Sequence, residues 1–327
     1  MIEIKVDNMA KGQITIIGLD AIGVSLTLAI KRARPAAFIV GVDDDPRRLQ
    51  AALKFGQLNR TEPLAVAGGR DADLVVINVP PSQLRATFQQ IGPSLRDGAV
   101  VLDLSPIKAQ VLTWAAEFLP DTVRHLSCHL ALHPDVNEWS EPKAELFHGA
   151  VLCMTPTTET DEVAIKSGSD LARVIGARPY FMDVHEHDGL LAAVEGVPGL
   201  VSAAMLLAAT HARSWPELAQ VAGSVFAYTT RSAQHPALDF GAALVYNQTD
   251  VLRWLDAFLG ELREVRQAVS DGDVTKLMTW LDEAAQLRAD WLAARPIAPW
   301  NDEDARPGPP SELKRMDPLM PGWGQKN

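Results

Sequence analysis

The sequence is short of cysteine, of basic residues and of metal-binding motifs, and each shortage excludes a class of protein. Two cysteines in 327 residues, Cys128 and Cys153, allow one disulfide bond but no disulfide framework. The 30 Lys and Arg residues are outnumbered by 41 Asp and Glu, which gives a formal net charge of −11. Nucleic acid is therefore not expected as a partner, because phosphate binding requires clustered cations. No CxxC pair or paired-histidine spacing is present, so no metal site is expected.

Long apolar runs are also missing. Residues 1–13 lack the apolar core of a signal peptide. The longest apolar run, residues 196–209, has 14 residues, which is too short to cross a bilayer. We therefore expect a cytoplasmic protein with reduced thiols and no membrane partner. The run itself predicts a buried helix or a helix at a dimer interface.

The sequence contains two regions of different character, which suits its length, since domains commonly have about 100–200 residues. Residues 1–182 alternate short apolar runs with helical patterns. The runs are continuous rather than alternating, as in strands that crossover helices bury on both faces. They predict an α/β fold with a mostly parallel, Rossmann-type sheet. Strands are predicted at residues 14–18, 38–42, 74–79, 99–102 and 150–153.

Residues 183–294 predict an all-helical domain. Long helical patterns cover residues 188–211, 241–269 and 274–294. In the second of these, Leu252, Leu255 and Leu259 recur every three or four residues, which is the spacing of a helix. Residues 295–327 are rich in Pro and Gly and predict an extended or disordered tail.

A glycine-rich loop follows the first predicted strand and opens a helix. Its residues Gly18-Leu19-Asp20-Ala21-Ile22-Gly23 nearly match the GxGxxG pattern of dinucleotide-binding folds. In that pattern Gly18 allows the tight turn and Gly23 the close packing of helix on strand, and the N–H groups from Ile22 onward face a pyrophosphate. Asp20 replaces the middle glycine. Its carboxylate would lie beside the pyrophosphate of the ligand. Two such like charges about 4–5 Å apart repel by roughly 3–4 kcal/mol at an effective dielectric near 20, so Asp20 disfavours binding.

An acidic residue ends the second predicted strand. Asp43 is placed to bind the ribose hydroxyls of NAD and to repel the 2′-phosphate of NADP. The loop and this residue therefore predict NAD binding, with NADP less favoured. Two alternatives remain open. The chain could keep a Rossmann scaffold whose cofactor site has decayed, and Asp43-Asp44-Asp45 could serve only as a helix cap before Pro46.

Several segments, in one order along the chain, resemble the motifs of a single family. Residues 18–26 resemble GLGLIGGSL, 72–80 (ADLVVINVP) resemble DADLVILAVP, 103–108 (DLSPIK) resemble DVGSVK, and 151–157 resemble ILTPT. His133-Pro134 resembles the start of HPMAG, His187-Asp188 an HD pair, and residues 223–233 GGGFRDxTRIA, with Asn247 following. By their order and spacing, residues 13–270 resemble the prephenate/arogenate dehydrogenases of tyrosine biosynthesis.

The resemblance implies an NAD(P)-dependent oxidoreductase that oxidatively decarboxylates a cyclohexadienyl acid, a small-molecule carboxylic acid substrate. His133 would take the hydroxyl proton, and Arg231 would bind a carboxylate. Ser105 lies next to the position of the family's serine, which Pro106 occupies. The cofactor would contact Gly18, Leu19, Asp20, Ile22, Gly23, Asp43, Val79, Pro80 and Lys108.

Each of these roles has a purely structural alternative. His133 could be a strand-end histidine bonded to backbone, Arg231 the member of an ion pair, and Lys108 a solvated lysine at a helix start. The family also pairs through its helical domain, so a homodimer is expected.

The sequence departs from the family at several positions of the same pocket. Asp20 and Pro106 replace a glycine and a serine, and Glu195-Gly196-Val197-Pro198-Gly199 stands where the family has SHLPH. Lost polar contacts could each cost about 1–3 kcal/mol of binding. Three alternatives to the dehydrogenase therefore remain open. They are a catalytically inactive relative that acts as a binding or regulatory protein, a dehydrogenase for a different hydroxy acid, and another Rossmann enzyme such as an imine reductase.

Overall fold

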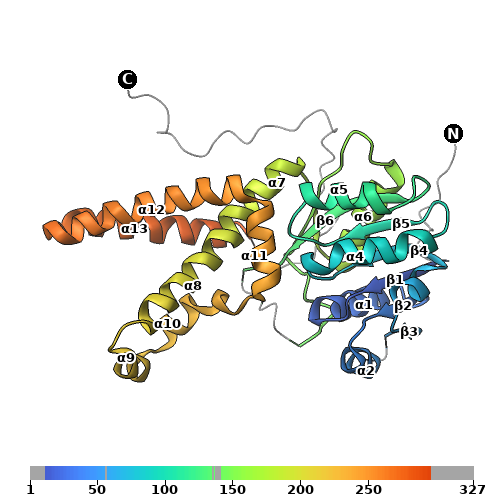
Figure 1. The fold of residues 1–327 in the computed structure, drawn as a ribbon, viewed down its shortest axis with the longest axis horizontal. Coiled ribbons are helices and arrows are strands. Elements are labelled where there is room, and N and C mark those ends of the chain that lie inside the picture. Colours follow the sequence, from blue (N-terminus) through green and yellow to red (C-terminus); the bar gives the residue numbers. More distant parts are fainter. Residues whose placement is uncertain (1–11, 56, 135, 137–140, 296–327) are drawn as a thin grey trace.

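The computed structural model describes residues 12–55, 57–134, 136 and 141–295, which form a sheet domain followed by a helical domain (Figure 1). The predicted tail, residues 295–327, lies outside the described residues except for Arg295. The sheet domain is compact in Figure 1, whereas the helical domain extends from it as two diverging arms. The last strand of the first domain ends at Phe181, and the first helix of the second begins at Val184.

An eight-stranded sheet in the order β3-β2-β1-β4-β5-β6-β7-β8 organises the first domain. All neighbouring strands are parallel except β6 and β7. The mostly parallel α/β fold predicted from the apolar runs is therefore confirmed. The strands are β1 (Gln13–Ile17), β2 (Phe38–Val42), β3 (Arg60–Glu62), β4 (Ala72–Ile77), β5 (Val100–Asp103), β6 (Arg124–Ala131), β7 (Val151–Met154) and β8 (Arg178–Phe181).

Helices cover both faces of the sheet, which explains the continuous apolar strands. One core joins the sheet to α1 and α6, and the other joins it to α4 and α5. The helices of this domain are α1 (Ala21–Ala33), α2 (Pro46–Lys54), α3 (Ala65–Gly69), α4 (Pro81–Ile91), α5 (Ala109–Phe118) and α6 (Glu162–Ile175). Cys128 and Cys153 lie on adjacent strands as separate, buried thiols.

A single helical rod, residues 184–210, connects the two domains. It consists of α7 (Val184–Leu191), a π-helical turn (Ala192–Gly196) and α8 (Val197–Thr210). The Asp183 carboxylate caps its start by accepting from the N–H groups of His185 and Glu186. The rod therefore begins four residues earlier than the predicted start at residue 188.

The remaining helices complete the second domain. They are α9 (Trp215–Val221), α10 (Ser224–Thr229), a short 3₁₀ turn (Arg231–Gln234), α11 (Ala237–Tyr246), α12 (Gln248–Asp271) and α13 (Val274–Ala293). In Figure 1 α12 and α13 form one arm, α8 leads into α9 and α10 in the other, and α11 lies beside the sheet domain. The prediction of one helix over residues 241–269 is wrong, because the chain turns at Asn247 between α11 and α12. The Asn247 amide donates to the Asp188 carbonyl and so ties this turn to α7.

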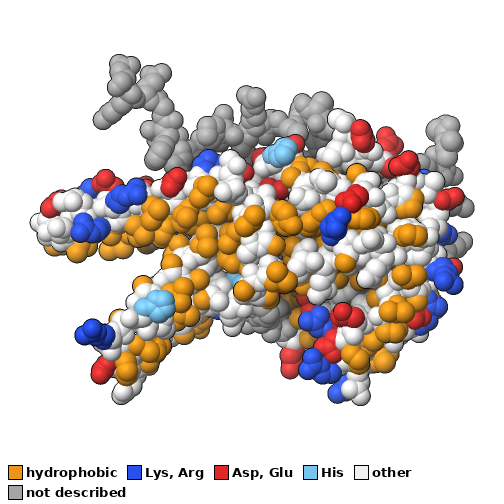
Figure 2. All heavy atoms as spheres, in the orientation of Figure 1, with side chains coloured by type: hydrophobic (Ala, Val, Ile, Leu, Met, Phe, Trp, Pro, Cys, Tyr) orange, Lys and Arg blue, Asp and Glu red, His pale blue; other side chains and the backbone are white. Residues whose placement is uncertain are grey.

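The helical domain leaves much of its apolar surface uncovered. The helical rod is apolar and long enough to cross a membrane, yet only 22% of its most apolar window is buried. The prediction that residues 196–209 form a buried helix is therefore wrong for the single chain, and the length argument from 14 residues fails for the continuous rod. Figure 2 shows apolar side chains along the facing sides of the two arms, where the space between them is open.

Candidate active site

A cleft of about 580 Å³ lies between the two domains. The first domain lines it with residues that follow β1, β4 and β5 and with the end of β6, and the second with the π turn, the 3₁₀ turn and α11. Ligands of open parallel sheets bind at this carboxyl edge, where the strand order reverses, and here it reverses between β1 and β4. The polar lining residues are Asn78, His129, His133, Glu195, Arg231, Ser232, Gln234, His235, Asp239 and Asn247.

The loop between β1 and α1 has the close backbone packing that a dinucleotide loop needs. Gly18 has φ +95°, and a Cβ there would lie 1.9 Å from the Asn78 carbonyl oxygen. A Cβ on Gly23 would lie 1.9 Å from the Gly18 carbonyl oxygen. Both positions therefore exclude side chains, which fits the role of the two outer glycines in binding a dinucleotide.

The middle position of the loop departs from that pattern. Asp20 caps α1, and its Oδ1 atom accepts from the N–H groups of Ile22 and Gly23, each at 3.0 Å. The Asn78 amide donates to the same oxygen at 2.7 Å. The carboxylate thus occupies the N-terminus of α1, where a phosphate oxygen would bind.

Asp43 lies at the end of β2 beside this loop, as the sequence predicts. It is buried, and its two oxygens accept from the N–H groups of Leu19 at 2.8 Å and Asp45 at 2.9 Å. Arg48 Nη1 is 3.6 Å from Asp43 Oδ2. The acidic residue is therefore held rigidly where an adenosine ribose would lie in a dinucleotide fold.

The predicted catalytic residues separate into two groups. His133 and Arg231 both line the cleft. The His133 Nε2 atom bonds to the Arg295 carbonyl oxygen, which can only accept. His133 Nε2 is therefore the donor of this bond.

Ser105 and Lys108 are not brought to the cleft, contrary to the prediction. The Ser105 hydroxyl is turned inward and accepts from the Ile107 N–H at 3.3 Å. The Lys108 ammonium is completely buried and donates to the Ser105 and Cys128 carbonyl oxygens and to the Ser127 hydroxyl. An ammonium has three donors, so Lys108 has none left for a cofactor.

Lys108 instead neutralises a buried carboxylate. Its Nζ atom is 3.6 Å from Oδ1 of Asp103, which also accepts from Ser127 and bonds to His125 through Oδ2. Burial alone would raise the pKa of Asp103, but the Lys108 charge and the His125 and Ser127 bonds outweigh burial and lower the pKa. None of these four residues lines the cleft, so the cluster has a structural role.

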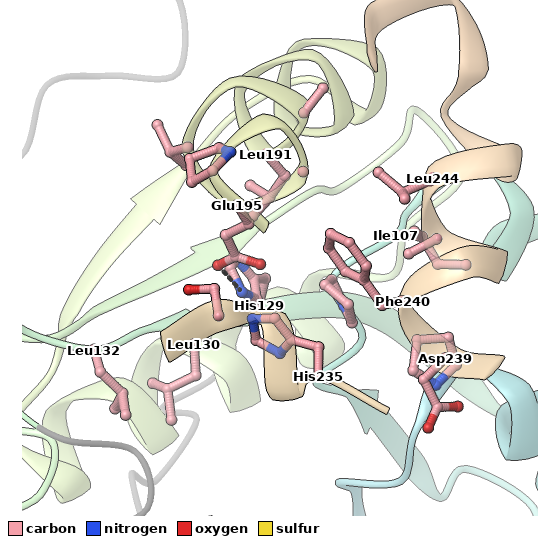
Figure 3. A pocket seen from close by; sticks show the side chains of 18 of the residues that line it. Ile107, His129, Leu130, Leu132, Leu191, Glu195, His235, Asp239, Phe240 and Leu244 are labelled. Atoms are coloured by element: carbon pink, nitrogen blue, oxygen red, sulfur yellow. Dashed lines mark ion pairs between the residues drawn. The ribbon is translucent and has the colours of Figure 1, made fainter. Parts of the chain in front are cut away.

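A pairing that sequence analysis missed joins the two domains across the cleft. His129 Nε2, on β6, is 3.6 Å from Glu195 Oε1, in the π turn, and Figure 3 shows the two side chains facing each other. The His187 ring meets the His129 ring edge-on, with centroids 5.2 Å apart. Burial, then the nearby His187 and Lys108, hold the pKa of His129 well below its usual value. His129 is therefore a neutral imidazole.

Apolar side chains occupy part of the space that the family's SHLPH histidines would fill. A Cβ on Gly199 would lie 2.3 Å from the tip of the Phe240 ring. His235 stacks on that ring with centroids 5.3 Å apart, and both side chains reach into the pocket in Figure 3. At Gly199 the neighbouring part of the pocket wall is therefore the Phe240 ring of α11.

Comparison with known proteins places both domains in one family. Residues 26–181 match the model of the prephenate dehydrogenase nucleotide-binding domain, and residues 183–283 match that of its dimerization domain. The chain is 25% identical over 283 residues to prephenate dehydrogenase of Bacillus subtilis, covering 86% of this chain and 76% of that protein. It is 27% identical over 299 residues to cyclohexadienyl dehydrogenase of Zymomonas mobilis, covering 90% and 98%.

Solved structures show the same fold. Aquifex aeolicus prephenate dehydrogenase in complex with hydroxyphenyl propionate and NAD+ superposes with a TM-score of 0.75 at 20% identity, covering 86% of this chain and 99% of that one. Synechocystis arogenate dehydrogenase gives a TM-score of 0.66 at 20% identity, with coverage of 85% and 99%. Because the two domain matches together span most of the sequence, the chain belongs to the prephenate dehydrogenase family.

Proposed function

We propose that this chain is an NAD-dependent dehydrogenase that oxidatively decarboxylates a cyclohexadienyl carboxylic acid of the prephenate or arogenate type. The observation that carries the proposal is that His133 and Arg231 both line the cleft beside the dinucleotide loop. The names of the relatives supply the substrate class.

The residues of the cleft suit the steps of this reaction. Arg231 binds a substrate carboxylate through its planar, bidentate guanidinium. His133 accepts the proton of the ring hydroxyl. When bound, the nicotinamide supplies the acceptor for the hydride from the carbinol carbon. The electron pair of the breaking carbon–carboxylate bond then completes the aromatic ring, and carbon dioxide leaves.

Cofactor choice in this proposal depends on Asp43. A carboxylate at the end of β2 accepts hydrogen bonds from ribose hydroxyls and repels a 2′-phosphate. NAD is therefore expected to bind more tightly than NADP. Titrating the protein with both nucleotides in a calorimeter tests this preference, and tighter NADP binding would contradict it.

Turnover is tested by following NAD reduction with prephenate and, separately, with arogenate. We expect reduction with at least one of them, and Arg231→Lys should raise KM because one ammonium cannot replace the bidentate contact. His133→Gln should lower kcat by about 10²–10⁴-fold, the usual contribution of a positioned base. A folded protein that binds NAD but turns over neither acid would instead favour a binding or regulatory relative, or a dehydrogenase for another hydroxy acid.

We also propose that the chain forms a homodimer in the cytoplasm through its helical domain. Its dimerization-domain match covers residues 183–283, which include most of both arms, whose facing sides are apolar. A second copy would cover these faces and would explain the apolar rod without a membrane. Sedimentation of the purified protein and fractionation of cells test both points, and a detergent-dependent, membrane-bound chain would contradict them.

A further inference from the structure

Two departures from the family motifs meet at the dinucleotide loop. Asp20 stands where GLGLIGGSL has its middle glycine, and Asn78 stands where DADLVILAVP has its last alanine. These positions follow β1 and β4, which are neighbouring strands. The Asn78 amide donates to Asp20 Oδ1 at 2.7 Å, so the two changed residues form one contact.

The Asp20 carboxylate uses the hydrogen-bond donors that a phosphate would need. The first N–H groups of a helix have no partner within the helix and normally bind a capping side chain or an anionic ligand. Here the N–H groups of Ile22 and Gly23 both point at Asp20 Oδ1. Together with Asn78 they give one oxygen three donors, the arrangement that a bound phosphate oxygen would otherwise have.

The carboxylate is nevertheless able to leave. Asp20 is exposed, so rotating its side chain into solvent removes three hydrogen bonds but opens no cavity. Ile22 and Asn78 both line the cleft, which places the carboxylate at the rim of the proposed site. The rest of the loop keeps the glycines that a close ligand requires.

We propose that Asp20 is an internal competitor for the pyrophosphate of the cofactor, held in place by Asn78. The dinucleotide binds when the Asp20 carboxylate rotates away from the N-terminus of α1, and the affinity of the enzyme for NAD is set by this exchange. The inference rests on the proposed NAD binding and adds a residue that limits it.

The test is calorimetric titration of the full chain and its variants with NAD. Asp20→Gly restores the middle glycine, and Asp20→Gly combined with Asn78→Ala restores both motif positions. Glycine replaces aspartate at a helix N-cap at little cost to stability, so both variants should fold. We expect Asp20→Gly to bind NAD about tenfold more tightly or better, because it removes both a competitor and a like charge. The double variant should bind at least as tightly.

Asp273→Gly is the matched control. Asp273 caps α13 in the helical domain by accepting from the Lys276 N–H at 2.9 Å, and its removal deletes the same charge far from the loop. NAD affinity in this variant should equal that of the parent chain. Equal affinity of the parent and Asp20→Gly would overturn the competitor role while leaving NAD binding intact. Failure of all variants and of the parent to bind would overturn both proposals.

Discussion

In the nucleotide-binding domain, β1, β4 and β5 bury nearly all of their side chains, whereas in the dimerization domain α9, α10, α11 and α13 bury none of their described residues. Both domains are rich in apolar residues, so composition does not explain the contrast. The sheet domain buries its apolar strands under helices on both faces of one sheet. The arms expose apolar faces that one chain cannot cover. The same apolar content is thus buried in one region and left exposed in the other.

The strongest test of the self-contained domain is its buried charge pair. Lys108→Met should destabilise the protein by about 3–5 kcal/mol, because it leaves the Asp103 carboxylate buried without its cation. Urea unfolding monitored by circular dichroism measures the loss. Adding Asp103→Leu to Lys108→Met should recover part of it. If stability were unchanged and NAD binding were lost, the result would instead support the predicted contact of Lys108 with the cofactor.

The arms are tested by placing a charge on each. Val225 on α10 is 78% exposed and Leu281 on α13 is 57% exposed in the single chain. Val225→Asp or Leu281→Asp should shift the protein from dimer to monomer, since each removes about 1.5–3 kcal/mol of apolar burial. Light scattering during size-exclusion chromatography gives the mass. Leu64→Asp, at an equally exposed position of the sheet domain (66%), should change nothing.

The pH dependence of stability tests the contact between the two domains, where His129 of β6 meets His187 of α7. Burial lowers the pKa of both His129 and His187 below 6.5. Between those folded values and the unfolded value near 6.5, the unfolded chain binds more protons, so stability falls as pH drops below about 6.5. Thermal unfolding from pH 8 to pH 5 should show this decline. His129→Phe should flatten it, and a profile as steep as that of the parent would contradict the assignment.

The smallest effect is expected from removing the charge of Glu195, the carboxylate in the π turn that lines the cleft. Glu195 is 51% exposed, so its repulsion of a substrate carboxylate amounts to about 1 kcal/mol after solvent screening. Under the proposed function, Glu195→Gln should lower the KM for prephenate about fivefold. Glu217→Gln, on the exposed first turn of α9, is the control. A higher KM in Glu195→Gln would mean that the carboxylate contacts the substrate favourably.

The sequence carried more information about the sheet than about the cleft. Continuous apolar runs located β1, β2, β4, β5 and β7 within two residues, because burial on both faces requires such runs. The edge strands β3 and β8 were missed, since RTE and RPYF have no apolar run. Likewise, the break at Asn247 coincides with its bond to Asp188, a tertiary contact that helical spacing does not record.

The site was predictable only where a motif fixes local geometry. Gly18, Gly23 and Asp43 lie in the positions that the dinucleotide pattern assigns to them. Lys108 occupies the lysine position of its motif, but its side chain is buried, with its ammonium 3.6 Å from the Asp103 carboxylate. The His129–Glu195 pairing and the Phe240 ring beside Gly199 join segments from different elements. Their proximity is a product of domain packing, which spacing along the chain does not encode.

The one extra residue in the π turn of the helical rod sets the direction in which the side chains of α8 point. Within this turn the Val197 N–H bonds back to the Ala192 carbonyl, five residues earlier, instead of four. One additional residue is thereby accommodated without breaking the rod, and each residue corresponds to about 100° around a helix axis. Every side chain beyond Gly196 is turned by about that angle relative to an uninterrupted α-helix. Deleting one residue from this turn would therefore rotate α8 about its own axis by about 100° relative to the sheet domain. Its apolar face would then point in a different direction, while the sheet domain itself would be unchanged.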